Sequence, residues 1–314
     1  MEVLVAQPVD PAGLRRVSAL LPDAVITCRE PLGPGESVPG LEDVTVLFAD
    51  HCPVNVADLV ALRWVQLGSA GYRQLAGLGL GPAVRVKNAS GVNDIPIAEW
   101  CVPMMLSFAR DYPGMLRAPA GASWVRDRVY QAELRGRRVG VFGYGSIGRE
   151  VTRVCGAPGL EVWALSRSQS SGPARFFAPA RLREFLSGPD FLVITAPLTD
   201  ETAGRFGAEE LARLPRHAVL LNPARAHVVD EAALLAALRN GTIAGAALDV
   251  HHREPMLPGD PFRTAPNTVV SPHVSGSTGS THFLPRLWDL FADNVSRFVA
   301  GAPLRNEIAR ADIG

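Results

Sequence analysis

Three segments of the sequence carry side chains that could act together on a carbonyl compound. Arg225 lies in NPARAHVVDEAALLAAL, Glu254 in LDVHHREP and His273 in SPHVSGST. Reduction of a 2-oxo acid needs a cation that holds the carboxylate and polarises the carbonyl, and a proton donor for the alkoxide that hydride addition creates. Arg225 suits the first role and His273 the second. Glu254 is placed to hydrogen-bond the imidazole and to favour its protonated form near neutral pH.

Each of these residues also has a simpler interpretation. A lone histidine is more often structural than catalytic, and an arginine after a strand is often only a surface charge. His251 and His252, next to Glu254, could also suggest a metal site, but no second ligand pair with zinc-like spacing follows them. We therefore expect no bound metal.

A glycine-rich segment predicts a dinucleotide site. The sequence VGVFGYGSIGREV supplies an apolar strand, then Gly143, Gly145 and Gly148 in the pattern GxGxxG, then the start of a helix. Gly143 permits a tight turn, Gly145 lets backbone N–H groups approach a pyrophosphate at the helix terminus, and Gly148 lets helix and strand pack closely.

The end of the next expected strand, 160–166, should lie beside the adenosine ribose. An NAD-specific site has Asp or Glu there, whereas this chain has Ser166 followed by Arg167. A carboxylate would repel a 2′-phosphate, but a hydroxyl and a guanidinium can hydrogen-bond it. The sequence therefore favours NADP over NAD. The alternative is that Arg167 is a solvated surface arginine.

Strand-length apolar runs alternate with helical patterns, which is typical of parallel α/β architecture. Five runs, at 3–5, 25–27, 44–48, 64–67 and 84–86, predict one small sheet. A second series starts at Arg138 and continues through VGVFG, EVWAL, FLVITA, HAVLLN, GAALDV and NTVVSPH, which predicts a larger sheet. We expect a Rossmann-type doubly wound cofactor domain and a smaller, flavodoxin-like α/β substrate domain.

Two helical segments decide the expected domain boundaries. An apolar helix over 95–110 should join the domains, and a partly irregular excursion should follow it up to residue 134. The segment 279–300 has aromatic and aliphatic residues at helical spacing, which we interpret as core. Because no strand follows this helix, we expect it to return to the first domain. The prediction is a discontinuous substrate domain of residues 1–102 and 283–314 around a cofactor domain of residues 103–282.

Composition narrows the classes of partner. Among 314 residues, 47% are hydrophobic, 20% are charged, and 31 basic side chains balance 31 acidic ones, which gives no overall field for a polyanion or an anionic membrane. We expect no nucleic-acid or membrane partner. Four widely spaced cysteines should be reduced and mostly buried thiols, and the protein should be cytoplasmic. The single lysine, Lys87, excludes a Walker-type phosphate loop.

The ordered segments GYGSIG, TAPLTDET, NPARAHVVDEAALLAAL, GAALDVHHREP and SPHVSGST resemble the D-isomer-specific 2-hydroxyacid dehydrogenase family. The resemblance runs from Ser69 to about Ala300 and includes VQLGSAGY and NASGVNDIPIAEW. It implies catalytic roles for Arg225, Glu254 and His273, carboxylate binding by Ser69, Ala70 and Gly71, and a homodimer assembled through the cofactor domains. It also implies further cofactor contacts at Tyr144, Ser146, Ile147, Thr195, Pro197, Asp249 and Gly276.

The expected activity is hydride transfer between NAD(P)H and a small 2-oxo acid to give a D-2-hydroxy acid. Because it lacks an acidic residue before Arg167, the sequence resembles the NADPH-preferring glyoxylate and hydroxypyruvate reductases. Two departures from the family pattern, NPARA and Ser275, could change the local backbone. The alternative function is a non-catalytic NAD(P)-sensing interaction protein or corepressor on the same fold, which fold alone cannot separate.

Overall fold

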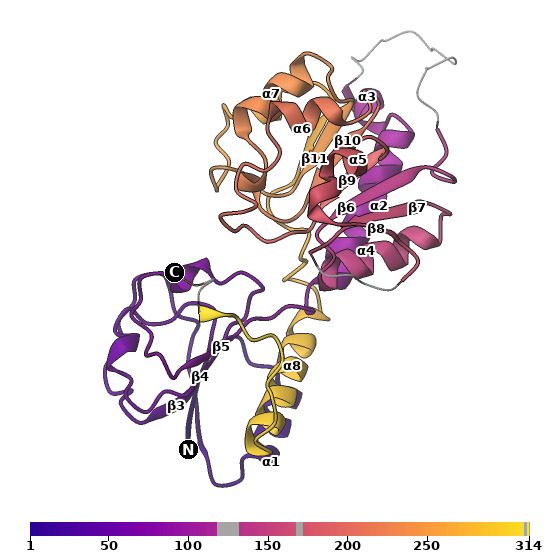
Figure 1. Ribbon diagram of the computed structural model, residues 1–314. Coiled ribbons are helices and arrows are strands. Elements are labelled where there is room, and N and C mark those ends of the chain that lie inside the picture. The colour runs from indigo at the N-terminus through magenta and orange to yellow at the C-terminus, as the bar shows by residue number, and fades with distance from the viewer. Residues whose placement is uncertain (118–131, 168–171, 311–312, 314) are drawn as a thin grey trace. The chain divides into compact units, whose positions relative to one another are not determined.

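The computed structural model describes residues 1–117, 132–167, 172–310 and 313. The chain divides into two compact units (Figure 1). The first unit comprises Met1–Asn93 and Ser277–Gly314, and the second comprises Asp94–Gly276. Most of the excursion expected before residue 134 lies outside the described residues.

The first unit is built on a five-stranded parallel sheet, as the sequence predicts. Its strands run in the order β2-β1-β3-β4-β5, which is the flavodoxin-like order. Their bounds are β1 (Glu2–Ala6), β2 (Val25–Cys28), β3 (Val44–Ala49), β4 (Trp64–Gln66) and β5 (Arg85–Lys87).

Two helices, α1 (Pro11–Leu20) and α8 (Phe283–Val299), lie side by side against this sheet (Figure 1). Trp288 and Phe291 of α8 are fully buried, and Phe291 stacks on Phe48 of β3 with ring centroids 4.2 Å apart. The aromatic stripe is therefore core, and the terminal helix does pack on the first sheet.

The edge strand β5 also receives the last part of the chain. Lys87 forms an antiparallel bridge with Glu307, and its fully buried ammonium pairs with the Glu307 carboxylate. Burial lowers the pKa of Lys87, although the bond to Glu307 opposes this shift.

The second unit contains a seven-stranded parallel sheet of order β12-β11-β10-β9-β6-β7-β8. From β6 this is the Rossmann order 3-2-1-4-5-6 with one further strand. The sequence predicts six of these strands and misses β8, which has three residues and lies at the sheet edge. Their bounds are β6 (Arg138–Phe142), β7 (Glu161–Leu165), β8 (Arg175–Phe177), β9 (Phe191–Ile194), β10 (Val219–Asn222), β11 (Gly245–Leu248) and β12 (Thr268–Val270).

Helices cover both faces of this sheet (Figure 1). One face packs against α2 (Asp94–Ala109) and α4 (Ser146–Gly156). The other packs against α5 (Leu182–Leu186), α6 (Ala208–Arg213) and α7 (Glu231–Arg239). The remaining short helices are η1 (Val56–Asp58), η2 (Arg73–Leu75), α3 (Tyr112–Arg117), η3 (Pro179–Arg181), η4 (Ala226–Val228) and η5 (Pro261–Arg263).

The unit boundaries differ from those that the sequence predicts. A boundary at 102 would cut α2, but Ala98 and Cys101 on this helix pack in the same cluster as Val151 and Leu221 of the second unit. The whole of α2 therefore belongs to the larger sheet, and the chain crosses back before α8, at residue 276.

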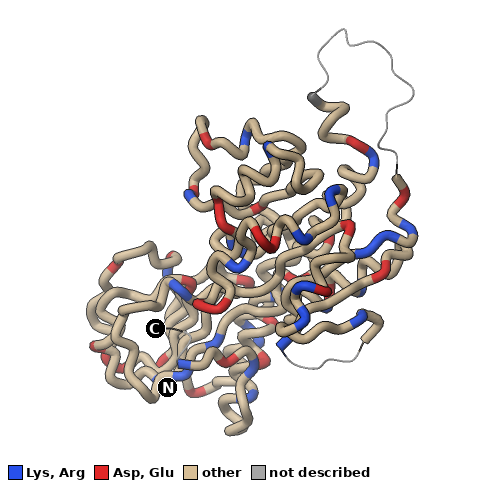
Figure 2. Tube along the Cα trace, turned by 45° about the horizontal axis from the view of Figure 1, so that its top comes forward, with Lys and Arg blue, Asp and Glu red and all other residues tan. Residues whose placement is uncertain are grey.

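The chain carries charged residues of both signs, and three of its four cysteines are buried. Basic and acidic positions lie intermixed along the described trace (Figure 2). All four cysteines are free; Cys28 is exposed, and Cys52, Cys101 and Cys155 are buried. Burial raises the pKa of the Cys155 thiol to about 12. None of the helices in the described residues is long and apolar enough to cross a membrane.

Candidate functional site

The three glycines after β6 have the geometry that their predicted roles require. Gly143 has a φ of +99°, and a Cβ there would lie 2.6 Å from the backbone nitrogen of Ala196. A Cβ on Gly148 would lie 2.3 Å from the carbonyl oxygen of Gly143. A Cβ on Gly145, the residue before α4, would meet nothing within 4 Å. Gly143 and Gly148 therefore have no room for a Cβ atom, whereas the space beside Gly145, at the start of α4, is open.

This open space belongs to a pocket of about 570 Å³ at the carboxyl ends of β6, β7 and β9. Its volume is within the range of small-molecule sites. The walls include Gly143, Tyr144, Gly145, Thr195 and Pro197, five residues predicted to bind the cofactor.

The walls of this pocket suit a dinucleotide. The hydroxyl of Thr195 donates to the Gly143 carbonyl over 2.6 Å, which ties the glycine turn to the end of β9. Ser146 and Ile147 are in the first turn of α4, whose N–H groups lie at the positive end of the helix dipole. Such N–H groups can bind a pyrophosphate.

The two residues predicted to distinguish NADP from NAD also line this pocket. Ser166 and Arg167 follow β7, and the Nη1 atom of Arg167 lies 3.7 Å from Oε2 of Glu201. Glu201 and Arg205, in the segment after β9, are on the pocket wall too. Sequence reasoning missed both, although Glu201 lies within the TAPLTDET segment.

His273 is held by a loop that wraps around a buried carboxylate. Asp249, directly after β11, is fully buried, and its oxygens accept hydrogen bonds from the Ser271 hydroxyl and from the backbone N–H groups of Val274 and Ser275. The Asp249 carbonyl accepts from the N–H of His273. His273 itself has a φ of +54°, in the left-handed region.

The structure thus gives Asp249 a positioning role that sequence reasoning did not assign. Its predicted contact with the cofactor stays a prediction, as does that of Gly276, which follows Ser275. Ser275, the departure noted in the sequence, is buried and contributes its N–H to this arrangement.

The predicted hydrogen bond between Glu254 and His273 is confirmed. Nδ1 of His273 lies 2.8 Å from Oε2 of Glu254, and Oε1 of the same carboxylate accepts from the N–H of His251 over 2.9 Å. Partial burial alone would raise the pKa of Glu254, but the bonds from His273 and His251 outweigh it and hold this pKa below its ordinary value. The carboxylate therefore stays charged at neutral pH, beside the imidazole.

Arg225 follows β10, so Arg225, Glu254 and His273 come after the ends of three adjacent parallel strands. The turn before Arg225 is fixed by buried Asn222, whose amide donates to the Arg225 carbonyl and accepts from the N–H of Ala224. Sequence reasoning missed Asn222. Its signal was a polar side chain at the end of an apolar strand.

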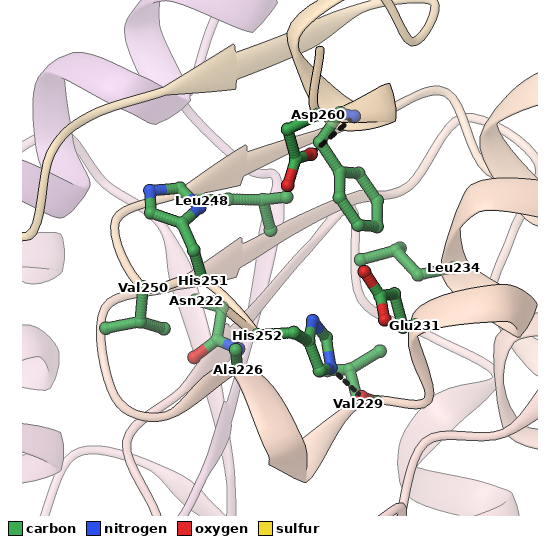
Figure 3. Close-up of a pocket in the computed structure, with 11 residues that line it drawn as sticks. Asn222, Ala226, Val229, Glu231, Leu234, Leu248, Val250, His251, His252 and Asp260 are labelled. Atoms are coloured by element: carbon green, nitrogen blue, oxygen red, sulfur yellow. Dashed lines mark hydrogen bonds between the residues drawn. The ribbon is translucent and has the colours of Figure 1, made fainter. Parts of the chain in front are cut away.

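His251 and His252, the alternative metal-binding residues, have structural partners. Nε2 of His251 lies 2.8 Å from the Ser271 carbonyl, and Nε2 of His252 lies 3.1 Å from the Val229 carbonyl. They flank a cavity of about 10 Å³, shown in Figure 3, which has room for about one water molecule. Within the described ranges, no three His, Cys, Asp or Glu side chains form a group that could hold a metal ion.

Ser69, Ala70 and Gly71 form a loop after β4 in the first unit. The amide of Gln74 donates to the Gly71 carbonyl and to the Ser69 hydroxyl, and the amide of Asn88 donates to the Ala70 carbonyl over 2.8 Å. The loop is therefore braced by neutral amides.

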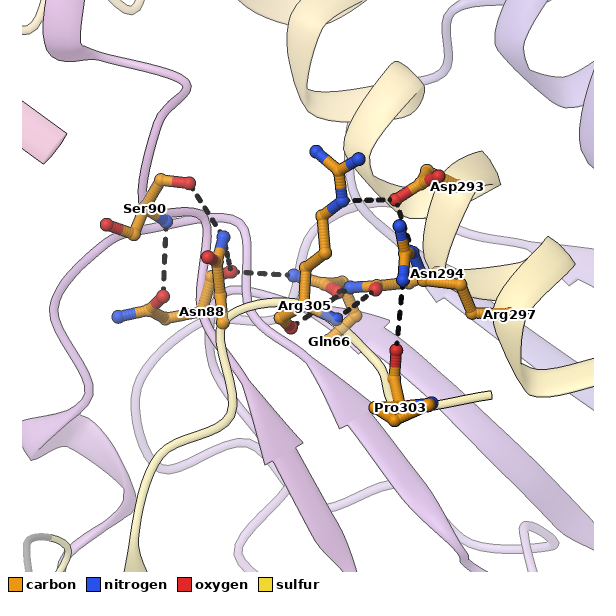
Figure 4. Close-up of polar contacts among 9 residues, drawn as sticks. Gln66, Asn88, Ser90, Asp293, Asn294, Arg297, Pro303 and Arg305 are labelled. Carbon is orange, nitrogen blue, oxygen red and sulfur yellow. Dashed lines mark hydrogen bonds and ion pairs between the residues drawn. The ribbon is translucent and has the colours of Figure 1, made fainter. Parts of the chain in front are cut away.

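Asn88 is itself held by hydrogen bonds that extend into the interior of the first unit (Figure 4). Buried Gln66 donates to the Asn88 carbonyl, and its own carbonyl accepts from buried Asn294 of α8 over 2.9 Å. Asn294 in turn accepts from the N–H of Arg305. The terminal helix is thus connected by hydrogen bonds to the strand end that carries the Ser69–Gly71 loop.

Comparison with known proteins identifies the family. The family model for the NAD binding domain of D-isomer specific 2-hydroxyacid dehydrogenases matches residues 102–275. The chain belongs to this family. Among curated relatives of 2-hydroxyacid dehydrogenase type, a glyoxylate reductase from Aeropyrum pernix is 33% identical over 236 residues, which cover 72% of this chain and 70% of that protein.

A D-3-phosphoglycerate dehydrogenase from Archaeoglobus fulgidus is also 33% identical, over 71% of this chain. The match spans 42% of the length of that protein, and a match to a glycerate dehydrogenase from Methylorubrum extorquens spans 52% of that one. The chain thus spans about half the length of these two 2-hydroxyacid dehydrogenases.

Solved structures of the family resemble the whole chain. A D-isomer specific 2-hydroxyacid dehydrogenase from Xanthobacter autotrophicus Py2, in complex with NADPH and MES, has a TM-score of 0.84 and 30% identity, with 98% of this chain and 97% of that chain covered. An NADPH-dependent glyoxylate/hydroxypyruvate reductase from Sinorhizobium meliloti, in complex with NADP and sulfate, has a TM-score of 0.82 and 26% identity, with 100% and 99% covered.

Proposed function

We propose that this chain is an NAD(P)H-dependent oxidoreductase that reduces a small 2-oxo acid to its D-2-hydroxy acid. The observation that carries the proposal is the His273–Glu254 hydrogen bond, at the same sheet edge as Arg225 and in the same unit as the pocket of about 570 Å³ beside the glycine turn. A protein that only senses the cofactor needs the pocket but not a histidine paired with a carboxylate.

In this proposal each residue of the site has one role. Arg225 binds the substrate carboxylate and polarises the 2-oxo group, and the family resemblance assigns backbone N–H groups of Ser69, Ala70 and Gly71 to carboxylate binding. Since Nδ1 of His273 donates to Glu254, the proton for the alkoxide comes from Nε2. Glu254 favours the imidazolium by its negative charge. The bound nicotinamide cofactor supplies the hydride.

We propose NADPH as the preferred cofactor and NADH as the weaker one. Ser166 and Arg167 line the pocket where an NAD-specific site has a carboxylate. The relatives from Xanthobacter and Sinorhizobium were solved with NADPH and NADP, which supports the same preference. In this proposal, the turn that contains Gly143, Gly145 and Gly148 binds the pyrophosphate of the cofactor.

We further propose that the chain acts in the cytoplasm as a homodimer, on a small-molecule substrate and without a nucleic-acid partner. The family resemblance supports the homodimer, and the equal numbers of basic and acidic side chains support a small-molecule partner. Light scattering after size-exclusion chromatography measures the assembly directly.

A panel of initial rates tests the activity. Glyoxylate, hydroxypyruvate, pyruvate and a bulkier 2-oxo acid are each assayed with NADPH and with NADH. We expect turnover of at least one acid, with kcat/KM higher for NADPH by roughly ten- to a hundredfold, a difference of about 1.4–2.8 kcal/mol. NADPH binding without turnover of any 2-oxo acid would instead support the sensor or corepressor, and equal rates with NADH would refute the cofactor preference.

A further inference from the structure

We propose that Glu201 competes with the 2′-phosphate of the cofactor for Arg167, and thereby sets how strongly the pocket prefers NADPH to NADH. The inference rests on the proposed function, because it concerns the same cofactor pocket. It assigns a role to an acidic residue that the sequence pattern of cofactor specificity does not include.

The geometry puts the two charges within reach of each other and of the same ligand. Arg167 follows β7, Glu201 lies in the turn after β9, and both line the pocket. Their closest charged atoms, Nη1 and Oε2, are 3.7 Å apart, which is an ion pair without a hydrogen bond. The side chains are 77% and 75% exposed, so the pair is weak and easily exchanged for a better partner.

The backbone beneath Glu201 is held in place. The Thr202 hydroxyl donates to the Pro197 carbonyl over 2.6 Å and accepts from the N–H of Thr199 over 2.7 Å. This turn keeps Glu201 at the pocket wall, so its carboxylate stays near the ligand even after Arg167 has left it.

A 2′-phosphate changes this pair in two ways. It carries close to two negative charges near neutral pH and can accept two parallel hydrogen bonds from a guanidinium, so it should displace Glu201 from Arg167. The displaced carboxylate then repels the phosphate. Glu201 therefore opposes NADPH binding both as a competitor and as a like charge.

The ribose of NADH has the opposite preference. Its 2′-hydroxyl is neutral and can donate a hydrogen bond to a carboxylate, which is the role of the acid that this chain lacks after β7. Glu201 can supply that carboxylate from the turn after β9. Arg167 thus favours NADPH and Glu201 favours NADH at one end of the pocket.

The other arginine on the wall has a different acidic partner. Nη1 of Arg205 lies 3.9 Å from Oε1 of Glu210, which belongs to α6 and does not line the pocket. Removal of Glu201 therefore leaves Arg205 with its partner and changes the surroundings of Arg167.

The test compares Glu201→Gln with a matched control, Glu209→Gln. Glu209 is 62% exposed, bonds Arg213 at 2.6 Å and pairs with Arg183 at 3.4 Å, and lies outside the pocket. Both variants remove one exposed carboxylate from the second unit. The Kd values of NADPH and NADH are measured with the full chain at low salt by cofactor fluorescence, so that the result does not depend on turnover.

We expect Glu201→Gln to raise the ratio Kd(NADH)/Kd(NADPH) by about two- to fivefold, the size of an exposed charge interaction. The control should leave this ratio unchanged, high salt should reduce the effect, and in an Arg167→Ala background the gain should shrink. An unchanged ratio in Glu201→Gln, or an equal change in Glu209→Gln, would overturn the inference.

The Kd ratio and the panel of initial rates together separate this inference from the proposed function. If NADPH binds and the ratio changes as expected but no 2-oxo acid is reduced, the proposed activity fails and the role of Glu201 stands. If 2-oxo acids are reduced but the ratio does not respond to Glu201→Gln, the activity stands and this inference fails.

Discussion

The two loops that present the proposed substrate-binding groups are braced by opposite kinds of chemistry. In the first unit, the Ser69–Gly71 loop hangs on the neutral amides of Gln74 and Asn88. In the second, the loop of His273 is wound around the buried carboxylate of Asp249. Each loop follows the carboxyl end of a parallel strand, but only one of them depends on a charge.

The difference follows from what each loop has to hold. His273 has a left-handed φ, which costs a non-glycine residue about 1–3 kcal/mol, so its loop needs strong bonds. Hydrogen bonds to a charged acceptor contribute about 1.5–3 kcal/mol each, against about 1 kcal/mol for neutral ones. In the Ser69–Gly71 loop no residue has a positive φ, and neutral amides suffice.

The largest effect should come from the group that the charged loop holds. His273→Ala should lower kcat for 2-oxo acid reduction by roughly a hundred- to ten-thousandfold if general acid catalysis is at work, with NADPH affinity retained. His252→Ala is the control, because that imidazole bonds a carbonyl beside the small cavity. Near-normal turnover of His273→Ala would show that another residue donates the proton.

Asp249→Asn tests the charged brace itself. In the variant, the side-chain NH2 group faces the backbone N–H of Val274 or Ser275, so two donors meet and one N–H loses its acceptor. This buried mismatch should lower the free energy of unfolding by about 1–3 kcal/mol. Because His273 loses its support, kcat should fall more than KM changes. Urea unfolding and steady-state kinetics measure the two effects. Wild-type values in both would show that the His273 loop does not depend on the charge of Asp249.

Glu254→Gln should move the pH dependence of the reaction. Reduction requires protonated His273, so its rate falls as the pH rises through deprotonation of the imidazole. Loss of the negative partner disfavours the imidazolium, so this fall should move to lower pH, while oxidation of the hydroxy acid gains over the same range. The pH profiles of kcat in both directions measure the change, and coincident wild-type and variant profiles would contradict the role of Glu254.

The pKa direction of Glu254 adds a second pH limit. Because this pKa is below its ordinary value in the folded protein, the stability that the carboxylate contributes is present above the pKa of the unfolded chain and is lost as pH falls through the lowered folded value. The Glu254 carboxylate should therefore keep its charge well into the acid range.

Asn88→Asp should give the smallest effect of this series, in the neutral loop. The substitution keeps the oxygen that accepts from the Ser90 N–H but removes the donor to the Ala70 carbonyl. We expect KM for the 2-oxo acid to rise by about tenfold, because the substitution removes one neutral hydrogen bond and adds a negative charge that repels an anionic substrate, with kcat little changed. A fall in kcat at constant KM would mean that Asn88 acts on the chemical step instead.

The sequence predicts the parts of the molecule that follow from local pattern. Apolar runs predict all five strands of the first sheet, and GxGxxG predicts a turn at Gly143 that has a positive φ in the structure. The edge strand β8 (Arg175–Phe177) is missed because its two phenylalanines lie between Arg175 and the nearby Pro179, which leaves no apolar run of strand length.

Long-range partners are the part that sequence reasoning could not supply. The apolar residues of α2 predict burial but not the sheet on which the helix packs, so the predicted boundary fell inside it. Asn222, Gln66 and Asn294 are single polar residues in apolar surroundings, and their bonds join segments distant in the chain. Glu254 and His273 were paired in advance because the chemistry required a partner for the imidazole.

The buried position of Lys87 has a practical consequence. Lys87 is the only lysine in the chain, and its ammonium is enclosed against Glu307 where the last segment bridges β5. Amine-reactive dyes and crosslinkers therefore find no lysine side chain on the folded surface. Modification at this one position, followed by mass spectrometry over time, would report how often the terminal segment detaches from the first sheet.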